Sequence, residues 1–210
     1  MADNYSQDFS NFPQLVRGRR MSRSFTDQTV DAELVDELVS LARFAPRAGN
    51  TQGIEFLLLE ESDIGEYWET TLDTENRDSF PWPNLFNAPV LILVWVDPER
   101  YIERYSEDDK KTSGLGGHVS AWKTPYWWVD GGMAAMTILL GAEARGLGAL
   151  FFGLFDHEDN VKTKFEVPKR FKSIGAIALG YADNQQRRSK SVDRPKRGFD
   201  EVVHRGSWAT

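Results

Sequence analysis

The stretch Asp130–Gly148, DGGMAAMTILLGAEARGLG, carries no charged side chain between Asp130 and Glu143. A helix of this composition has no face suited to water, so we expect it to lie in the core. Asp130 stands where it can cap the first turn, and Gly146 stands where a left-handed C-terminal cap is expected. The element would run for roughly 16 residues, or about 24 Å.

One side of this expected helix collects small residues, which would let another backbone come close: Gly131, Ala134, Ala135 and Ala142. The opposite side collects larger residues that fill space: Met133, Met136 and Leu140. Taken alone, this pattern describes a central core helix and indicates no activity. The functional argument therefore depends on the rest of the chain.

Length and composition predict a single domain, residues 1–210, with a substantial core. Apolar residues make up 40% of the 210 residues, and seven Trp and thirteen Phe supply large buried areas. The chain has no cysteine, which excludes disulfides, thiolate nucleophiles and Cys-ligated metal centres. The first residues are polar and no apolar run is long enough to span a membrane, so we expect a cytoplasmic protein without a membrane partner.

The charge distribution favours a small anion as ligand. A net charge of −7 opposes binding to nucleic acid. Basic residues nevertheless gather at two remote places, around 17–23 and around 187–197. The three histidines are scattered, and no spacing of a metal site or a Ser-His-Asp triad is present.

Helices and strands are interspersed, which predicts a layered α+β or α/β domain. A helix over Phe12–Arg19 is expected to turn Leu15 and Val16 inward, and Asp31 should cap a helix over Asp31–Ala45. Shorter helices are expected over Tyr67–Leu72, Pro98–Tyr105 and His157–Val167. Apolar runs rich in β-branched residues predict strands over Ile54–Leu59, Val90–Val96, Ala149–Phe152 and Ser173–Leu179. The tail, residues 184–210, keeps enough apolar surface that we expect it to pack on a partner subunit.

Two loops allow both a structural and a functional interpretation. After Pro46, the amides of Asn50 and Gln52 suit reading the edge of a heterocycle, or they serve ordinary turn chemistry. The aromatic run 122–128 could anchor the start of the central helix, or it could form a flat lid over a planar ligand. The residues of this run proposed to meet a substrate are Trp122, Tyr126 and Trp127.

Five motifs, in order, resemble those of the FMN-dependent nitroreductase family. They are RRMSRSF at 19–25, APRAGNTQ at 45–52, VDGG at 129–132 through GLG at 146–148, IALGY at 177–181, and the basic element at 194–203. The resemblance covers roughly residues 16–208. It implies an α+β nitroreductase-like fold with a central, mostly antiparallel sheet flanked by helices. It also implies an interlocked homodimer, with the central helices packed at the interface and one FMN at each end of it.

The resemblance also implies which residues hold FMN. They fall in four groups: Arg19, Arg20, Met21 and Arg23; Pro46, Arg47, Ala48, Asn50 and Gln52; Phe152 and Gly153; Arg194, Lys196 and Arg197. Met21 and Arg47 depart from the family, which has Ser at both positions. Met21 has no side-chain donor for a phosphate, so arginines or backbone amides would have to replace it. Arg47 adds a cation that could favour an anionic substrate or a phosphorylated cofactor.

The implied chemistry belongs to the cofactor, since a flavin accepts a hydride at N5 from NAD(P)H and passes it on by a ping-pong mechanism. No protein residue needs to act as nucleophile and no metal is expected. The acceptors would be nitroaromatics, quinones or similar electron-poor small molecules. Two alternatives stay open: a flavin-dependent dehydrogenase or dehalogenase of one metabolite, and a non-enzymatic flavin-binding sensor.

Overall fold

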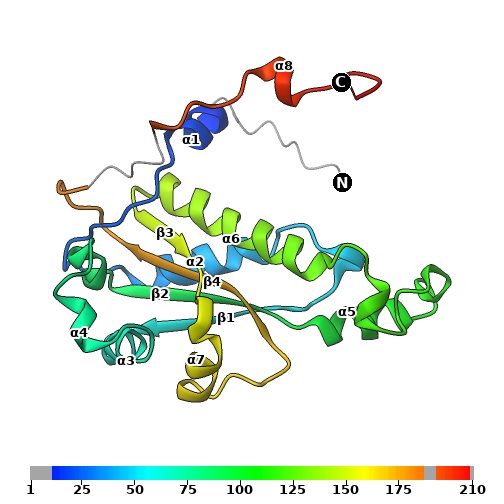
Figure 1. Cartoon of the computed structure of the whole chain (residues 1–210), viewed down its shortest axis with the longest axis horizontal. Coiled ribbons are helices and arrows are strands. Elements are labelled where there is room, and N and C mark those ends of the chain that lie inside the picture. Colours follow the sequence, from blue (N-terminus) through cyan, green and yellow to red (C-terminus); the bar gives the residue numbers. More distant parts are fainter. Residues whose placement is uncertain (1–10, 187–192, 209–210) are drawn as a thin grey trace.

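The computed structural model describes residues 11–186 and 193–208 (Figure 1). Its centre is a four-stranded antiparallel sheet in the order β1-β2-β4-β3. The strands are β1 (Ile54–Glu60), β2 (Val90–Val96), β3 (Gly148–Phe152) and β4 (Lys172–Gly180). Each lies within a residue or two of its predicted bounds. Helices flank this antiparallel sheet, so the predicted α+β class is confirmed.

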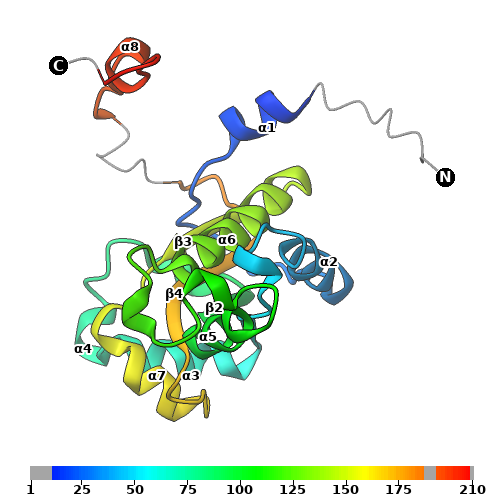
Figure 2. The same ribbon diagram turned by 90° about the vertical axis from the view of Figure 1, so that its right-hand side faces the viewer.

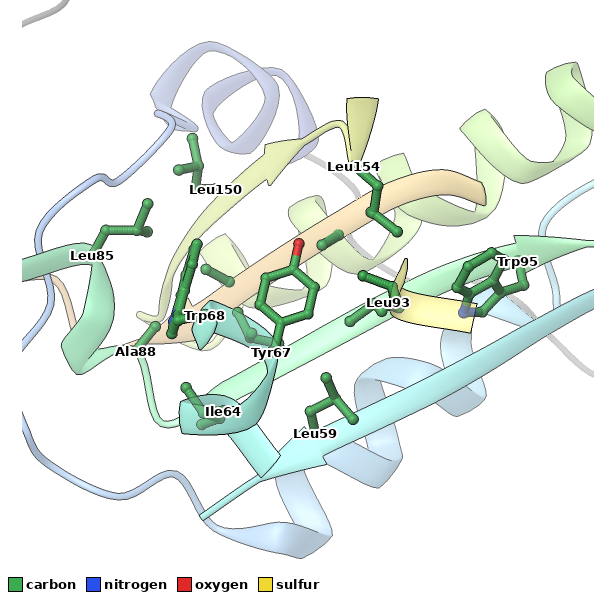
Figure 3. Packing of buried hydrophobic residues seen from close by; sticks show 14 of the residues in the cluster. Leu59, Ile64, Tyr67, Trp68, Leu85, Ala88, Leu93, Trp95, Leu150 and Leu154 are labelled. Atoms are coloured by element: carbon green, nitrogen blue, oxygen red, sulfur yellow. The ribbon is translucent and has the colours of Figure 1, made fainter. Parts of the chain in front are cut away.

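Strand β2 lies inside the sheet and is buried along its whole length because it has a neighbour on each side and a layer on each face. Its side chains alternate between the two faces, as a pleated strand requires. Leu91, Leu93 and Trp95 join a core cluster with α3 (Ser62–Thr71) and α7 (Glu158–Lys164). Figure 3 shows this side of the core, where Tyr67 and Trp68 of α3 lie over the strands. The alternate residues of β2 pack against α2 (Ala32–Ala42) and α6 (Tyr126–Ala144).

Helix α6 begins earlier than expected. It starts at Tyr126 after the N-cap Pro125, so Asp130 lies inside the helix and does not cap it. The aromatic residues 126–128 form its first turn, and the Asp130 carboxylate is occupied by donors from other elements. The C-terminal prediction is confirmed, because Gly146 follows the helix with a φ of +71°.

The small face of α6 packs on the chain's own sheet, contrary to the expectation that it forms the seam with a partner's helix. A Cβ added to Gly131 would lie 2.6 Å from Ile174 Cγ1 and 2.9 Å from Val96 Cγ1. The outward face carries the larger residues, with Trp128, Val129 and Met136 about two-fifths exposed. The small residues therefore let the helix approach the strands.

Helix α2 follows its prediction closely. The Asp31 side chain accepts a hydrogen bond of 2.8 Å from the Glu33 N–H, which confirms the cap. The helix ends at Ala42, three residues before the predicted end. It packs on α6 where a Cβ at Gly141 would lie 2.7 Å from Leu38 Cδ2.

The remaining elements are short. The α-helices are α1 (Phe12–Gly18), α4 (Thr74–Arg77), α5 (Pro98–Ser106) and α8 (Phe199–Val202). Single 3-10 turns occur at Ala48–Asn50, Pro83–Asn87, Lys111–Ser113, Val119–Ala121 and Phe155–His157. Among the described residues no helix combines the length and apolar character needed to cross a membrane.

Helices α1 and α8, at the two ends of the described chain, lie at the edge of the molecule (Figures 1 and 2), and α1 contacts the body at α6. Helix α1 forms as predicted, but it buries none of its residues, and Val16 is 42% exposed. The expectation that Leu15 and Val16 both turn into the core is therefore wrong, because Leu15 is only half-buried and Val16 is exposed. In the tail, Phe199 and Trp208 are exposed, and its packing on a partner subunit stays a prediction.

Candidate functional site

A cleft of about 370 Å³ lies between α3, the loop at 80–82 and the end of β3. It brings together three of the residues predicted to hold the cofactor, Arg23, Phe152 and Gly153. Most of the other lining residues are aromatic or aliphatic. Apolar walls with a few polar groups are typical of small-molecule sites.

The segment carrying the first arginines is held against the sheet as a short added strand. Met21 pairs in parallel with Ala149, and the Ser22 N–H donates 2.9 Å to the Ala149 carbonyl. The Met21 side chain packs against both core clusters, so it fills space in the core. Met21 therefore offers no side-chain contact to a phosphate.

Asp183 fixes the next residues of this segment. Its Oδ2 accepts hydrogen bonds from Ser24 Oγ at 2.7 Å and from Asn84 Nδ2 at 3.0 Å. The hydrogen bond from Ser24, with those from the Gln185 N–H and Asn84, holds the pKa of the Asp183 carboxyl below its usual value. The carboxylate thereby ties the chain after β4 to the segment that leads into the cleft.

Arg23 is positioned at the cleft by contacts on both its main chain and its side chain. Its N–H donates 2.9 Å to Gln186 Oε1. Its guanidinium lies 5.6 Å from the ring centroid of Trp82, a cation–π distance. A cation is thus held at the mouth of an otherwise apolar cleft.

Arg19 and Arg20 differ sharply in their contacts. Arg20 Nη1 donates to the carbonyls of Arg17, Gly18 and Arg19 at 2.6 to 2.9 Å, and so closes the end of α1. Arg19 has Nε and Nη1 shielded from solvent without a hydrogen-bond partner. Shielded donors without a partner are costly, so Arg19 is the arginine of this pair that is ready to bind an anion.

The second predicted group, the loop at 46–52, is anchored on Asp130. The Ala48 N–H donates 2.8 Å to Asp130 Oδ2, and the Tyr101 hydroxyl donates to the same oxygen over 2.8 Å. Burial and the hydrogen bond to Asp130 raise the pKa of Tyr101, which keeps the phenol protonated as a donor. The carboxylate within α6 therefore determines where this loop begins.

Within the loop, the predicted ligand side chains bind one another. Arg47 Nη1 donates 2.7 Å to Gln52 Oε1, and Nη2 donates 2.8 Å to the Arg43 carbonyl. Gln52 Nε2 donates 2.9 Å to the Asn50 carbonyl. Asn50 has a φ of +55°, a conformation uncommon for residues other than glycine. Pro46 is exposed beside this network.

The two groups lie at opposite ends of α6. The loop at 46–52 is bonded to Asp130 in its second turn, whereas a Cβ at Gly18, next to Arg19, would lie 3.4 Å from Glu143 Oε1 in its last turn. Asp130 and Glu143 are 13 positions apart, which is about 20 Å along a helix. One chain therefore does not bring the two predicted halves of the cofactor site together.

The aromatic run is mostly structural. Trp122 and Trp127 are 5% and 3% exposed and pack edge-on against Tyr101, with ring centroids 5.9 and 5.8 Å away. Trp122 Nε1 donates 2.9 Å to the Leu115 carbonyl. The lid interpretation is therefore wrong for these two residues, because their faces are covered by the chain itself. Tyr126 is 44% exposed.

The three tail residues predicted to hold the cofactor do not line the cleft. Arg194, Lys196 and Arg197 are exposed, and Arg197 is engaged within α8, donating 2.6 Å to the Glu201 carbonyl. No contact between these three residues and Arg19 or Arg23 occurs among the described residues. The basic positions at 187, 188 and 190 lie outside the described residues.

Sequence reasoning missed most of the cleft wall. Trp68 stacks on Phe152 with ring centroids 5.9 Å apart, and Trp82 faces Arg23. The sequence signal for Trp82 is the FPWP stretch at 80–83, whose two prolines predict a stiff loop and no more. Trp68 had no signal, since one aromatic residue on an amphipathic helix usually belongs to the core.

Comparisons with known proteins agree on one family. The model described as Nitroreductase family matches residues 16–181. A relative from Archaeoglobus fulgidus, named "Putative NADH dehydrogenase/NAD(P)H nitroreductase", is 23% identical over 201 residues, covering 93% of this chain and 97% of its own. A second relative, the 4-nitrobenzoate reductase of Nocardioides sp., is 27% identical over 202 residues, covering 83% of this chain and 81% of its own.

A solved structure gives the same result for the fold. The FMN-dependent nitroreductase of Clostridium difficile superposes with a TM-score of 0.64 at 20% identity, covering 92% of this chain and 98% of that one. The matched region, 16–181, contains the sheet, α6 and both predicted halves of the site. The chain belongs to the Nitroreductase family.

Proposed function

We propose that this chain is an FMN-dependent oxidoreductase that uses NAD(P)H to reduce nitroaromatics, quinones or similar electron-poor molecules. Membership of the family and the names of the relatives support an NAD(P)H oxidoreductase. The observation that carries the cofactor assignment is Arg19, whose shielded nitrogens lack a partner on the segment that leads into the cleft.

The residues present fit the phosphate of FMN. Arg19 would donate charge-assisted hydrogen bonds from Nε and Nη1, which would satisfy two donors that the chain leaves unpaired. Met21 cannot help, because it packs against the core. We assign the terminal phosphate to Arg19, and the tail residues Arg194, Lys196 and Arg197 remain candidates for a second contact.

The cleft fits one side of a flavin ring. The heavy atoms nearest to a Cβ at Gly153 would be ring carbons of Phe155, at 3.5 to 3.7 Å. A flat ligand could lie against the backbone at this glycine, which carries no side chain of its own. Arg23, held by Trp82, would stabilise negative charge on the reduced ring. When bound, FMN supplies the group that takes two electrons from a reduced nicotinamide and gives them to the acceptor. The protein would bind, orient and shield it.

We further propose that the working unit is a homodimer. The Arg19 group and the loop at 46–52 are about 20 Å apart along α6, too far to hold one ring system from a single chain. A second copy would supply the missing half at each cleft. The exposed apolar residues of α6 and of the tail offer surface for that contact, among them Trp128, Met136, Phe199 and Trp208.

The acceptor is proposed to be a small electron-poor aromatic. The cleft is walled by aromatic rings, and Arg23 is the one Arg or Lys among the described residues that line it. The relative named 4-nitrobenzoate reductase carries an anionic nitroaromatic in its name. An anionic nitroarene would meet both features of this cleft.

Purified protein tests the proposal. We expect a yellow dimer whose bound flavin is bleached by NADH or NADPH under anaerobic conditions, and recoloured by a quinone or 4-nitrobenzoate. Recolouring of the reduced flavin by one halogenated metabolite, and by neither of these acceptors, would favour the dehalogenase. Bleaching of the oxidised flavin by one metabolite in place of NAD(P)H would favour the dehydrogenase. Bound flavin without NAD(P)H oxidation would favour a sensor. A colourless monomer that does not bind added FMN would contradict the proposal.

A further inference from the structure

A second cavity, of about 680 Å³, lies between the start of α2, helix α3 and the turn at 83–87. Its apolar wall includes Ile64, Trp68 and Ala88, which Figure 3 shows close to one another. Trp68 also lines the proposed flavin cleft, so this one residue is shared by the two cavities. The volume is within the usual range of roughly 300–1,000 Å³ for small-molecule sites.

Arg77 is the one basic residue among the described residues that line this second cavity. Its Nε and Nη2 are shielded and have no hydrogen-bond partner, and its side chain forms no ion pair with a described residue. These two nitrogens form the edge of a guanidinium that donates two parallel hydrogen bonds to a carboxylate. No hydrogen bond or ion pair with a described residue holds the Arg77 side chain. It could therefore turn toward a ligand in the cavity without breaking such a contact.

Three carboxylates line the same cavity. Asp27, Glu60 and Glu61 are exposed, and their side chains form no ion pair with a described residue. Glu61 has a φ of +49°, a conformation that costs free energy for a side chain of this kind. Strained residues of this type cluster at ligand sites. The cavity thus combines one unpaired cation, unpaired anions and an aromatic wall.

We propose that this cavity binds a small zwitterion with an aromatic body, of the chemical class of an aromatic amino acid. Its carboxylate would bind Arg77, its ammonium would face the carboxylates at Glu60 and Glu61, and its ring would pack on Trp68 and Phe86. Rings prefer such offset or edge contacts with other aromatic side chains. The site is separate from the flavin cleft and does not depend on the proposed redox function.

Other ligand classes fit the cavity less well. A polyphosphate would meet three carboxylates for a single arginine and would be repelled. A simple amine would leave Arg77 unpaired, and a simple carboxylate would leave the acidic groups unpaired. Only a ligand with both charges offers a partner to Arg77 and to acidic groups of the cavity at once.

Calorimetric titration of the full-length protein with L-phenylalanine tests the proposal, with 3-phenylpropionate and 2-phenylethylamine as probes that lack one charge each. We expect saturable binding of one phenylalanine per chain and at least tenfold weaker binding of both analogues. No saturable binding of phenylalanine would overturn the proposal. Equal affinity for 3-phenylpropionate would overturn the role of the acidic residues.

Two variants locate the binding. Arg77→Gln should weaken phenylalanine at least tenfold, with Lys169→Gln, an exposed lysine on another surface, as the control for lost positive charge. Gly65→Leu should abolish binding by filling the cavity, because Gly65 lines it and an added Cβ meets nothing within 4 Å. Gly65→Ala, which also favours the helix, should bind normally. Unchanged affinity in both Arg77→Gln and Gly65→Leu would overturn the assignment.

The titration is repeated with saturating FMN and without it. Phenylalanine binding unchanged by FMN supports a separate site, whereas displacement by FMN would place the ligand in the flavin cleft and overturn the proposal. Gly65→Leu and Arg77→Gln should retain NAD(P)H oxidation, since neither residue lines that cleft. If the proposed redox function proved wrong, the phenylalanine titration would still test this site.

Discussion

The hydroxyl of Tyr101 donates a 2.8 Å hydrogen bond to Oδ2 of Asp130, a carboxylate that is fully buried inside α6. The same oxygen accepts from the Ala48 N–H, so one acidic group joins the central helix, α5 and the loop at 46–52. These two donors satisfy Oδ2, whereas Oδ1 is buried without a hydrogen-bond partner. Asp130 is thus placed to fix the loop that we expect to meet the flavin.

Asp130→Asn should loosen this loop and destabilise the fold. The amide oxygen can keep the two bonds that Oδ2 accepts, but the amide nitrogen would replace Oδ1, which is buried without a hydrogen-bond partner. Its N–H donors would be buried unpaired, so we expect a loss of about 1–3 kcal/mol in the free energy of unfolding. FMN affinity should fall as well. Urea unfolding and flavin titration measure both effects.

Tyr101→Phe is the matched control, since it leaves the Ala48 bond to Asp130 in place and should weaken FMN less than Asp130→Asn does. Equal FMN affinity in Asp130→Asn and wild type would separate this carboxylate from the flavin loop.

Arg19→Gln should weaken FMN by roughly 10- to 100-fold, because a hydrogen bond to a charged group is worth about 1.5–3 kcal/mol. Arg20→Gln should have a smaller effect on FMN, since Arg20 is bonded to backbone carbonyls. Equilibrium dialysis of the apoprotein against FMN gives both constants. A larger loss for Arg20→Gln would reverse the assignment of the two arginines.

Stability should depend on pH through Asp183. Its pKa is lowered in the folded chain, chiefly by the Ser24 hydroxyl, so its contribution is complete above the unfolded pKa of about 3.9. That contribution is lost as the pH falls through the lower folded pKa. Asp183→Asn should therefore lower the unfolding midpoint at pH 7. Between pH 5 and pH 3 the midpoint of this variant should fall less than that of the wild type. Parallel acid curves for the two proteins would contradict this role.

Trp122 and Trp82 should respond differently to truncation. Trp122→Ala removes a buried ring from the cluster around Tyr101 and should cost about 3–5 kcal/mol of stability. Trp82→Ala removes the ring beside Arg23 at the cleft and should change the KM for 4-nitrobenzoate more than it changes stability. Thermal unfolding and steady-state kinetics distinguish them, and a change of KM confined to Trp122→Ala would restore the lid interpretation.

Local patterns predicted the elements well. The unbroken apolar run of β2 matches a strand covered on both faces, and the Asp31 cap formed as its position predicts. The start of α6 could not be predicted from local sequence, because the aromatic residues before Asp130 resemble a loop. The partners that bury Asp130, at positions 48 and 101, are remote in sequence.

The site was predictable only in part. Arg23, Phe152 and Gly153 meet in one cleft, as the motifs indicated. Periodicity showed that one face of α6 is small but not which neighbour it packs on. It also could not show that Arg20 turns back on its own backbone while Arg19 stays unpaired, since both lie in one basic run.

The most direct test of the two-chain site is subunit complementation. Arg19→Gln impairs the first half of the site, and the double variant Asn50→Ala with Gln52→Ala impairs the second half. Co-expression in equal amounts would form mixed dimers, each with one intact site. Flavin occupancy, measured by absorbance at an FMN concentration where neither variant alone is loaded, should return to about a quarter of the wild-type sites, the share expected for random pairing. Occupancy no higher than in the separate variants would show that each chain holds its own cofactor, and would contradict the account.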